Sequence, residues 1–240
     1  SFYNQKDIFF LSTVIISTYF GLRYIRKPDI TVTLLFSLSS ALAFNTRIMA
    51  LLVILLILFI FCLKFLRSIT FYKKNRKYLF YYIFFLLLFI FISWPYLWTN
   101  PIGNFIFILR ELFSESYSLS NFYLGQYVLS TNIPWHYHIV WIGVTTPIIV
   151  LIFFILGSSF ILKRLFFRFN KIDDKLNDLW RGDNEMVDLY FLSIIFISIT
   201  TFTIKSIGYS GWRHLYFIYP AIIMVSINAF YRLKIIIKNK

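Results

Sequence analysis

The sequence predicts an all-α fold, a polytopic bundle of about seven transmembrane helices with an extracytoplasmic loop that contains a short interfacial helix. Of the 240 residues, 59% are hydrophobic and only 14% are charged, whereas a soluble domain has about 25% charged residues. The mean hydropathy is +0.73. The apolar residues form long runs without alternating periodicity, which favours membrane helices over a barrel.

Seven apolar stretches are candidates for the roughly 20 residues that a helix needs to cross a bilayer. The second stretch is short, so it is either tilted or only partly inserted. The stretches are Ile8–Ile25, Ile30–Phe44, Ile48–Leu66, Tyr78–Trp94, Ile139–Leu162, Val187–Ile207 and Leu215–Leu233.

The basic residues orient these helices. Nineteen of the 24 Lys and Arg residues fall in alternate connections, at 23–27, 64–77, 163–181 and 232–240. By the positive-inside rule these connections face the cytoplasm. The other five are Lys6, Arg47, Arg110, Lys205 and Arg213. The net charge of +14 therefore indicates an orientation in the membrane, and no nucleic-acid partner is predicted.

The organisation that follows is one transmembrane domain over residues 1–240, with an extracytoplasmic loop at 94–138 and a cytoplasmic loop at 163–186. The charged cytoplasmic connections are either ordinary orienting loops or a patch for a partner or anionic lipid. Because the chain starts at Ser1 rather than Met, we expect a fragment that lacks N-terminal spans and the first external loop. The single cysteine, Cys62, excludes an intramolecular disulfide.

The extracytoplasmic loop is rich in aromatic residues. Pro95 and Pro101 end a helix among tryptophans, and Phe105–Phe113 has the pattern of a short amphipathic helix in the membrane plane. The segment Pro134–His138 then leads into the fifth span. A loop of this length is either functional or an aromatic belt at the interface.

Two outer arginines are candidate ligands for an anion. Arg47 is the only cation between two apolar helices, and it either binds an anionic headgroup or extends to the interface. Arg213 and His214 follow Gly211 and Trp212 at the start of the last span. A helix N-terminus and an arginine fork both suit a phosphate, although the two residues also suit the anchoring of a helix end. Pro220 predicts a kink.

Other chemistry is not indicated. The sequence has no phosphate-cradling glycine loop, dinucleotide fingerprint or serine nucleophile elbow. The three histidines have no spacing that predicts a metal site. We expect neither a metal nor a cofactor.

Four motifs in order resemble the polytopic glycosyltransferases of the GT-C superfamily, specifically the bacterial relatives of protein O-mannosyltransferases and aminoarabinose transferases. They cover most of the chain, from about Leu34 to Leu233, and the last is the most specific. They are Thr46-Arg47-Ile48, Trp94-Pro95-Tyr96-Leu97-Trp98, Pro134-Trp135-His136-Tyr137 with Val140-Trp141 and Thr145-Thr146-Pro147, and Gly211–Pro220.

The resemblance implies sugar transfer from a polyprenyl-phosphate donor at the extracytoplasmic face of a bacterial inner membrane. It implies that Arg213, Arg47 and His214 bind the donor phosphate. It also implies a sugar or acceptor pocket formed by Trp135, His136, Tyr137, Trp212 and Tyr209. The family's catalytic acidic residue is expected upstream of Ser1, so no catalytic residue is assigned in this chain. The acceptor is a protein, a lipid or a glycan.

The alternative is a non-catalytic lipid-binding membrane subunit or a transporter of a lipid-linked sugar. A transporter typically has broken helices and polar groups near the midplane. The polar groups here lie near the outer ends of mostly aliphatic and aromatic spans, which favours a site at the outer face.

Overall fold

The computed structural model describes residues 5–67, 69–114, 119–170, 183–204 and 211–238. The chain divides into two compact units, Ser1–Tyr117 and Ser118–Lys240. Within the described ranges it is mostly helical, as the sequence predicts, with one short β-hairpin. Five helices are long and apolar enough to cross a membrane, and two shorter apolar helices, Ile30–Thr46 and Ala50–Leu66, accompany them.

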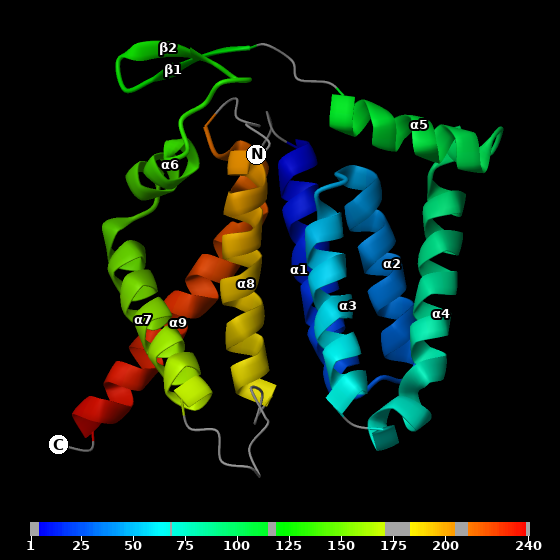
Figure 1. Ribbon diagram of the computed structural model, residues 1–240, viewed down its shortest axis with the longest axis horizontal. Coiled ribbons are helices and arrows are strands. Elements are labelled where there is room, and N and C mark those ends of the chain that lie inside the picture. The colour runs from blue at the N-terminus through cyan, green and yellow to red at the C-terminus, as the bar shows by residue number, and fades with distance from the viewer. Residues whose placement is uncertain (1–4, 68, 115–118, 171–182, 205–210, 239–240) are drawn as a thin grey trace. The chain divides into compact units, whose positions relative to one another are not determined.

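Unit 1 is built from four long helices followed by two shorter ones. The elements are α1 (Gln5–Arg26), α2 (Ile30–Thr46), α3 (Ala50–Arg67), α4 (Ile69–Ser93), the 3₁₀ helix η1 (Pro95–Leu97) and α5 (Pro101–Ser114). Helix α2 packs against both α1 and α4 (Figure 1). The Asp29 side chain caps α2 by accepting a hydrogen bond from the Val32 backbone N–H at 2.8 Å, which ends the turn after α1.

Small and hydroxyl-bearing residues let the helices of unit 1 approach one another. The hydroxyls of Ser17 on α1 and Ser40 on α2 are hydrogen-bonded at 3.0 Å. A Cβ at Gly21 would lie 2.4 Å from Cδ1 of Ile57 on α3. The Tyr24 ring packs against those of Phe36 and Phe61 in tilted arrangements, with centroids 5.5 and 4.5 Å away. The short, serine-rich α2 is therefore an interior helix of this unit.

Helix α4 is longer than the span predicted at its position. It begins at Ile69 rather than Tyr78, so the basic run 73–77 is helical instead of forming a loop. Lysine and arginine are good helix formers, and their side chains extend readily from a helix end. Only 11% of the apolar stretch of α4 is buried within the protein, compared with 39% of the apolar stretch of α1. The exposed apolar surface of α4 is what a lipid-facing helix requires.

Helix α5 contains the whole of the predicted amphipathic segment. The Asn100 side chain accepts a hydrogen bond from the Gly103 backbone N–H at 3.1 Å, and Pro101 occupies the first helical position. Trp98, which follows η1, donates a hydrogen bond from Nε1 to the Phe91 carbonyl oxygen of α4 at 2.8 Å. This bond holds η1 next to the end of α4. Ile106 is exposed.

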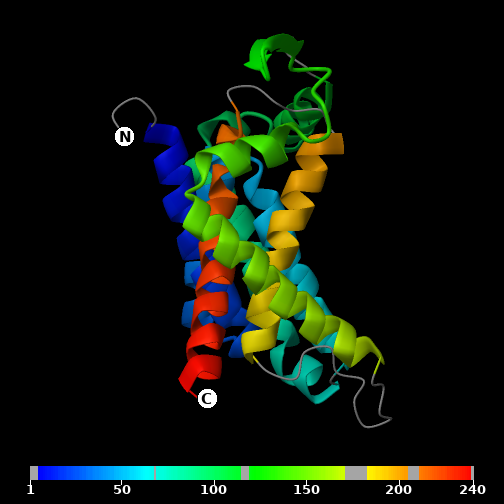
Figure 2. The ribbon, with the colours of Figure 1, turned by 90° about the vertical axis from the view of Figure 1, so that its left-hand side faces the viewer.

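Unit 2 contains a hairpin, a short helix and three long helices. The elements are β1 (Ser120–Tyr123), β2 (Gln126–Leu129), α6 (Tyr137–Thr145), α7 (Ile148–Asn170), α8 (Asp183–Ile204), the 3₁₀ helix η2 (Arg213–Ile218) and α9 (Tyr219–Lys238). Helices α7 and α9 cross in close contact (Figures 1 and 2). A Cβ at Gly157 would lie 2.2 Å from the Val225 carbonyl oxygen, so this crossing depends on a residue without a side chain.

The predicted fifth span, Ile139–Leu162, is wrong as one continuous helix. It is broken between α6 and α7 at Thr146 and Pro147. Thr146 is extended, with ψ 135°, because a residue before proline is disfavoured in the helical region. Proline also has no N–H to continue the helical hydrogen bonds. The long apolar helix therefore starts at Ile148.

The last predicted span also begins differently. Residues Arg213–Ile218 form the 3₁₀ helix η2, and the α-helix starts at Tyr219. Pro220 therefore lies in the first turn of α9, where its missing N–H is tolerated, rather than at a kink within a helix. The expected α-helical N-terminus at Arg213 is not formed.

The loop predicted at 163–186 is shorter in the structure. Helix α7 continues to Asn170 and α8 begins at Asp183. Arg164 and Asp188 are thus helical residues.

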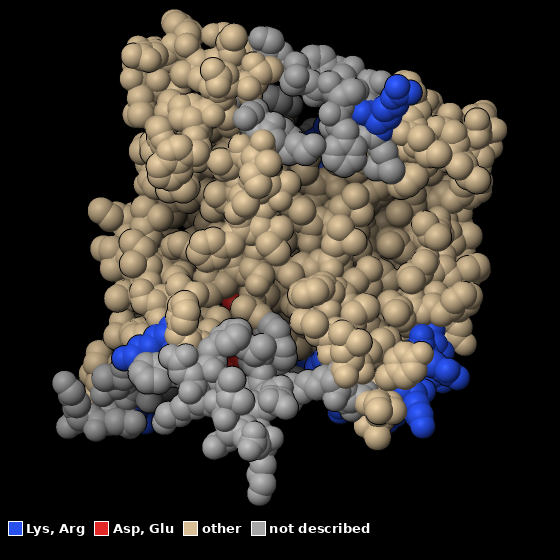
Figure 3. Space-filling model, in the orientation of Figure 1, with Lys and Arg blue, Asp and Glu red and all other residues tan. Residues whose placement is uncertain are grey.

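Apart from Lys6, Arg47, Arg110 and Arg213, the described basic residues of each unit gather at one end. In unit 1 they lie at the C-terminal ends of α1 and α3 and the N-terminal part of α4, where Lys64 donates to the Ile25 carbonyl oxygen at 3.0 Å. In unit 2 they lie at the C-terminal ends of α7 and α9. Figure 3 shows blue side chains near the N-terminal end of α4 and the C-terminal end of α9, and a further one beside α5. This is the distribution that the alternating charge pattern predicts for antiparallel helices.

Candidate functional site

The structure brings two of the sequence motifs together at the cation-poor end of unit 2. Gly211 donates a backbone hydrogen bond to the hydroxyl oxygen of Tyr137 at 3.2 Å. Gly211 has φ +70°, and a Cβ there would lie 3.4 Å from Trp141. The positive φ favours glycine at this position, whereas a Cβ would make only an ordinary contact with the indole. The turn before η2 is therefore held against α6.

A second hydrogen bond joins the same two segments. Trp212 Nε1 donates to the Thr145 hydroxyl at 2.7 Å. The Trp212 ring lies 5.6 Å from Tyr216 and 6.0 Å from Tyr219, and the two tyrosine rings are stacked at 5.8 Å with an interplanar angle of 7°. We call the four aromatic residues Tyr137, Trp212, Tyr216 and Tyr219, together with Thr145 as the hydrogen-bond partner of Trp212, the aromatic cluster.

Tyr137 is the buried centre of this end of the unit. It is 1% exposed, and its ring lies 4.8 Å from Tyr123 of the hairpin. Burial raises the pKa of the Tyr137 hydroxyl, and the hydrogen bond from the Gly211 backbone N–H acts in the opposite direction. The hydroxyl is therefore protonated at neutral pH.

The hairpin of strands β1 and β2 was not predicted. Leu124 and Gly125 form its two-residue turn with φ 50° and 84°, which is the conformation of a type I′ turn. Tyr123 packs inward with Ile133 and Tyr137, whereas Phe122 and Tyr127 are paired across the strands on the exposed face. A two-residue turn containing glycine was the available signal.

The remaining predicted residues of the pocket are more open. Trp135 is 70% exposed and forms an edge-to-face contact with half-buried His136 at 5.4 Å. His136 also lies 5.8 Å from Tyr123. Tyr209 lies outside the described residues.

Arg213 projects from the first position of η2, next to the aromatic cluster. Its side chain is exposed, and that of His214 is half-buried. A guanidinium at this position can offer paired N–H donors to an anion. The aromatic neighbours have apolar faces that suit the C–H surfaces of a sugar ring and polar tips that suit its hydroxyl groups.

Arg47 has a different environment in unit 1. It forms an ion pair with Asp7 of α1, and its guanidinium carbon lies 5.8 Å from the centre of the Phe10 ring. The side chains of Arg47 and Asp7 are 18% and 7% exposed. The arginine therefore has an anionic partner within the chain, which the sequence did not indicate. Arg47 belongs to unit 1 and Arg213 to unit 2.

Comparisons of the chain with protein-family models, with curated proteins and with solved structures return no match.

Proposed function

We propose that this chain is an integral membrane protein that binds a polyprenyl-phosphate-linked sugar at the cation-poor ends of its helices and takes part in transferring the sugar. The observation that carries the proposal is the pairing of Tyr137 with Gly211 and of Thr145 with Trp212, at 3.2 and 2.7 Å. These contacts unite the two most extensive motifs of the glycosyltransferase resemblance, and they place Arg213 beside aromatic rings.

The orientation is part of the proposal. The basic ends of the helices face the cytoplasm of a bacterial cell, and the aromatic cluster faces outward. Helix α5, with exposed Ile102 and Ile106, lies along the outer interface.

In the proposed reaction, the acceptor oxygen forms a bond to the anomeric carbon of the donor. The bond from that carbon to the phosphate oxygen breaks, and the electron pair leaves with the phosphate. Arg213 stabilises the charge that develops on this phosphate. A carboxylate accepts the proton of the acceptor hydroxyl, and we assign this role to no residue of the chain.

A second candidate is a lipid-binding membrane subunit without catalysis. The specific observation in its favour is the ion pair of Asp7 with Arg47, because this outer carboxylate is already bound to an arginine. Such a subunit binds the same donor but does not transfer the sugar.

The proposal is tested with the purified protein in lipid nanodiscs and a polyprenyl-phosphate sugar. Arg213→Gln should weaken binding on the order of tenfold, because charge-assisted hydrogen bonds to the phosphate are lost. Arg110→Gln removes an equally exposed arginine from α5 and should leave the affinity unchanged.

Equal losses in the two variants would contradict a phosphate site at Arg213. Binding that depends on Arg213 without release of polyprenyl phosphate in the presence of acceptors would favour the non-catalytic subunit. Release that depends on Arg213 would support the transferase.

A further inference from the structure

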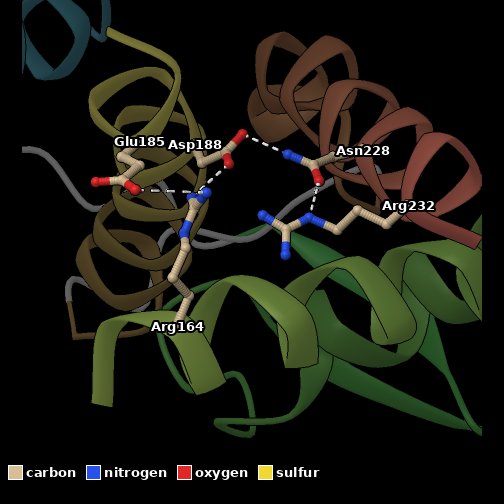
Figure 4. A network of polar contacts seen from close by, with 5 residues as sticks. All are labelled: Arg164, Glu185, Asp188, Asn228 and Arg232. Atoms are coloured by element: carbon tan, nitrogen blue, oxygen red, sulfur yellow. Dashed lines mark hydrogen bonds and ion pairs between the residues drawn. The ribbon is translucent and has the colours of Figure 1, made fainter. Parts of the chain in front are cut away.

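A chain of hydrogen bonds joins α7, α8 and α9 at the cation-rich end of unit 2 (Figure 4). Arg164 on α7 donates from Nη2 to Oδ2 of Asp188 on α8 at 2.6 Å. The other oxygen of Asp188 accepts from Nδ2 of Asn228 on α9, also at 2.6 Å. Oδ1 of Asn228 in turn accepts from Nε of Arg232 at 2.8 Å. We call these four residues the helix-linking network.

The carboxylate of the network is already engaged. Both oxygens of Asp188 accept hydrogen bonds, one from Arg164 and one from Asn228. Glu185 lies 4.0 Å from Nη1 of Arg164, so it also faces that arginine. The acidic side chains therefore contact Arg164 directly, whereas the hydrogen-bonded link from Asp188 to Arg232 runs through the neutral amide of Asn228.

The guanidinium of Arg232 is held in place by Asn228, but no carboxylate is bonded to it in the described part of unit 2. Its Nε is bonded to Asn228, and in the described part of unit 2 no acceptor is bonded to its two terminal amino groups (Figure 4). A half-buried guanidinium whose terminal amino groups have no bonded acceptor in the described part of unit 2 can bind an anion.

The position of Arg232 indicates the source of that anion. It lies near the end of the apolar segment 213–234, and Arg164 lies near the end of the apolar segment 148–166. This boundary is the depth at which lipid phosphates lie beside a membrane protein. An arginine that only extends to the interface needs no anchor, whereas the guanidinium of Arg232 is held at Nε by Asn228.

We propose that Arg232, assisted by Arg164, binds the phosphate of an anionic membrane lipid at the cation-rich end of unit 2. The two terminal amino groups of Arg232 match two phosphate oxygens in a bidentate arrangement. Asn228 is a positioning residue for this site, because it orients Arg232 without reaching the ligand. The proposal is independent of glycosyl transfer and of Arg213.

The test measures thermal unfolding of the purified protein in detergent with added phosphatidylglycerol, phosphatidylcholine or inorganic phosphate. We expect phosphatidylglycerol to raise the unfolding temperature more than phosphatidylcholine does. In Arg232→Gln this difference should largely disappear. Lys238→Gln removes the same charge from the same helix, at an exposed position, and should preserve the difference.

Two further variants distinguish recognition of the phosphate by the guanidinium from a general effect of positive charge. They also provide a test if Arg232→Gln does not fold. Arg232→Lys keeps the charge but loses the fork, so its apparent affinity for phosphatidylglycerol should fall on the order of tenfold. Asn228→Leu changes no charge but releases Nε of Arg232, and it should also weaken the effect. If Arg232→Gln does not fold, these two variants carry the test, with bound lipid counted by native mass spectrometry.

A full phosphatidylglycerol effect in Arg232→Lys and Asn228→Leu would overturn the proposal. So would a loss in Lys238→Gln as large as in Arg232→Gln. An equal stabilisation by inorganic phosphate that depends on Arg232 would support the phosphate chemistry and overturn the lipid as its source.

Discussion

The hydroxyl oxygen of Tyr137 accepts a hydrogen bond from the backbone N–H of Gly211, 74 positions later in the chain, at 3.2 Å. Tyr137 begins α6, and Gly211 lies in the turn that leads into η2. This contact holds the segment that carries Arg213 against a helix that is itself packed on the hairpin through Tyr123. The geometry of the turn before Arg213 therefore depends on Tyr137.

Tyr137→Phe tests this dependence. The variant leaves the Gly211 N–H without its acceptor in a partly buried position, which should lower the free energy of unfolding by about 1 kcal/mol. The measurement is thermal unfolding in detergent. Tyr127→Phe, at a position that is 80% exposed, is the control and should have no effect. A Tyr137→Phe protein as stable as the control would show that the contact does not contribute.

Gly211→Ala should be more disruptive than an ordinary glycine substitution. Gly211 has φ +70°, and an added Cβ would lie 3.4 Å from Trp141. We expect a loss of about 1–2 kcal/mol in stability from the left-handed backbone conformation, together with weaker donor binding.

Gly143→Ala is the matched control for that variant. Gly143 lies in α6, and a Cβ there meets nothing within 4 Å. Alanine in a helix is favoured over glycine by up to about 1 kcal/mol, so this variant should be neutral or stabilised. Equal destabilisation of both variants would contradict the special role of the Gly211 turn.

The Asp7–Arg47 pair should behave as one unit. Asp7→Asn leaves a largely buried guanidinium without its counter-charge and should cost about 2 kcal/mol of stability. The double variant Asp7→Asn/Arg47→Gln should cost less than the sum of the single variants. Lys6→Gln, at the adjacent exposed position, should be neutral. Additive losses in the double variant would argue against the pairing.

Topology is tested by single cysteines in a Cys62→Ser background. Tyr127→Cys in the hairpin should react with a membrane-impermeant reagent in intact cells. Lys238→Cys, at the end of α9, should react only after the cells are opened. Both positions are exposed in the structure, so the difference reports the side of the membrane. The reverse pattern would overturn the proposed orientation.

The helices were predictable because long apolar runs leave few alternatives. The break at Pro147 was visible as a Thr-Pro dipeptide, but the continuous apolar pattern on either side concealed it. The Asp7–Arg47 pair was not predictable, because the sequence does not say which faces of α1 and α2 meet. The four-residue spacing of Asn228 and Arg232 was visible, whereas their link to Asp188 depends on how α8 and α9 pack.

The structure of the segment around Arg213 was predictable only in part. Glycines next to Trp212 and Arg213 indicated a special turn, and the turn is indeed held by Tyr137. The 3₁₀ geometry of η2 was missed, because Pro220 was interpreted as a kink within a helix rather than as the start of one. Thr145 as the partner of Trp212 also depends on tertiary packing, which the local pattern does not encode.

The most direct test of the proposed donor site is photo-crosslinking with a polyprenyl phosphate that carries a photoreactive group beside the phosphate, followed by mass spectrometry of the labelled peptides. The account predicts labelling within residues 211–219 that falls strongly in Arg213→Gln and persists in Arg232→Gln. Labelling confined to residues 160–168 and 228–234, or labelling of 211–219 that is undiminished in Arg213→Gln, would contradict it.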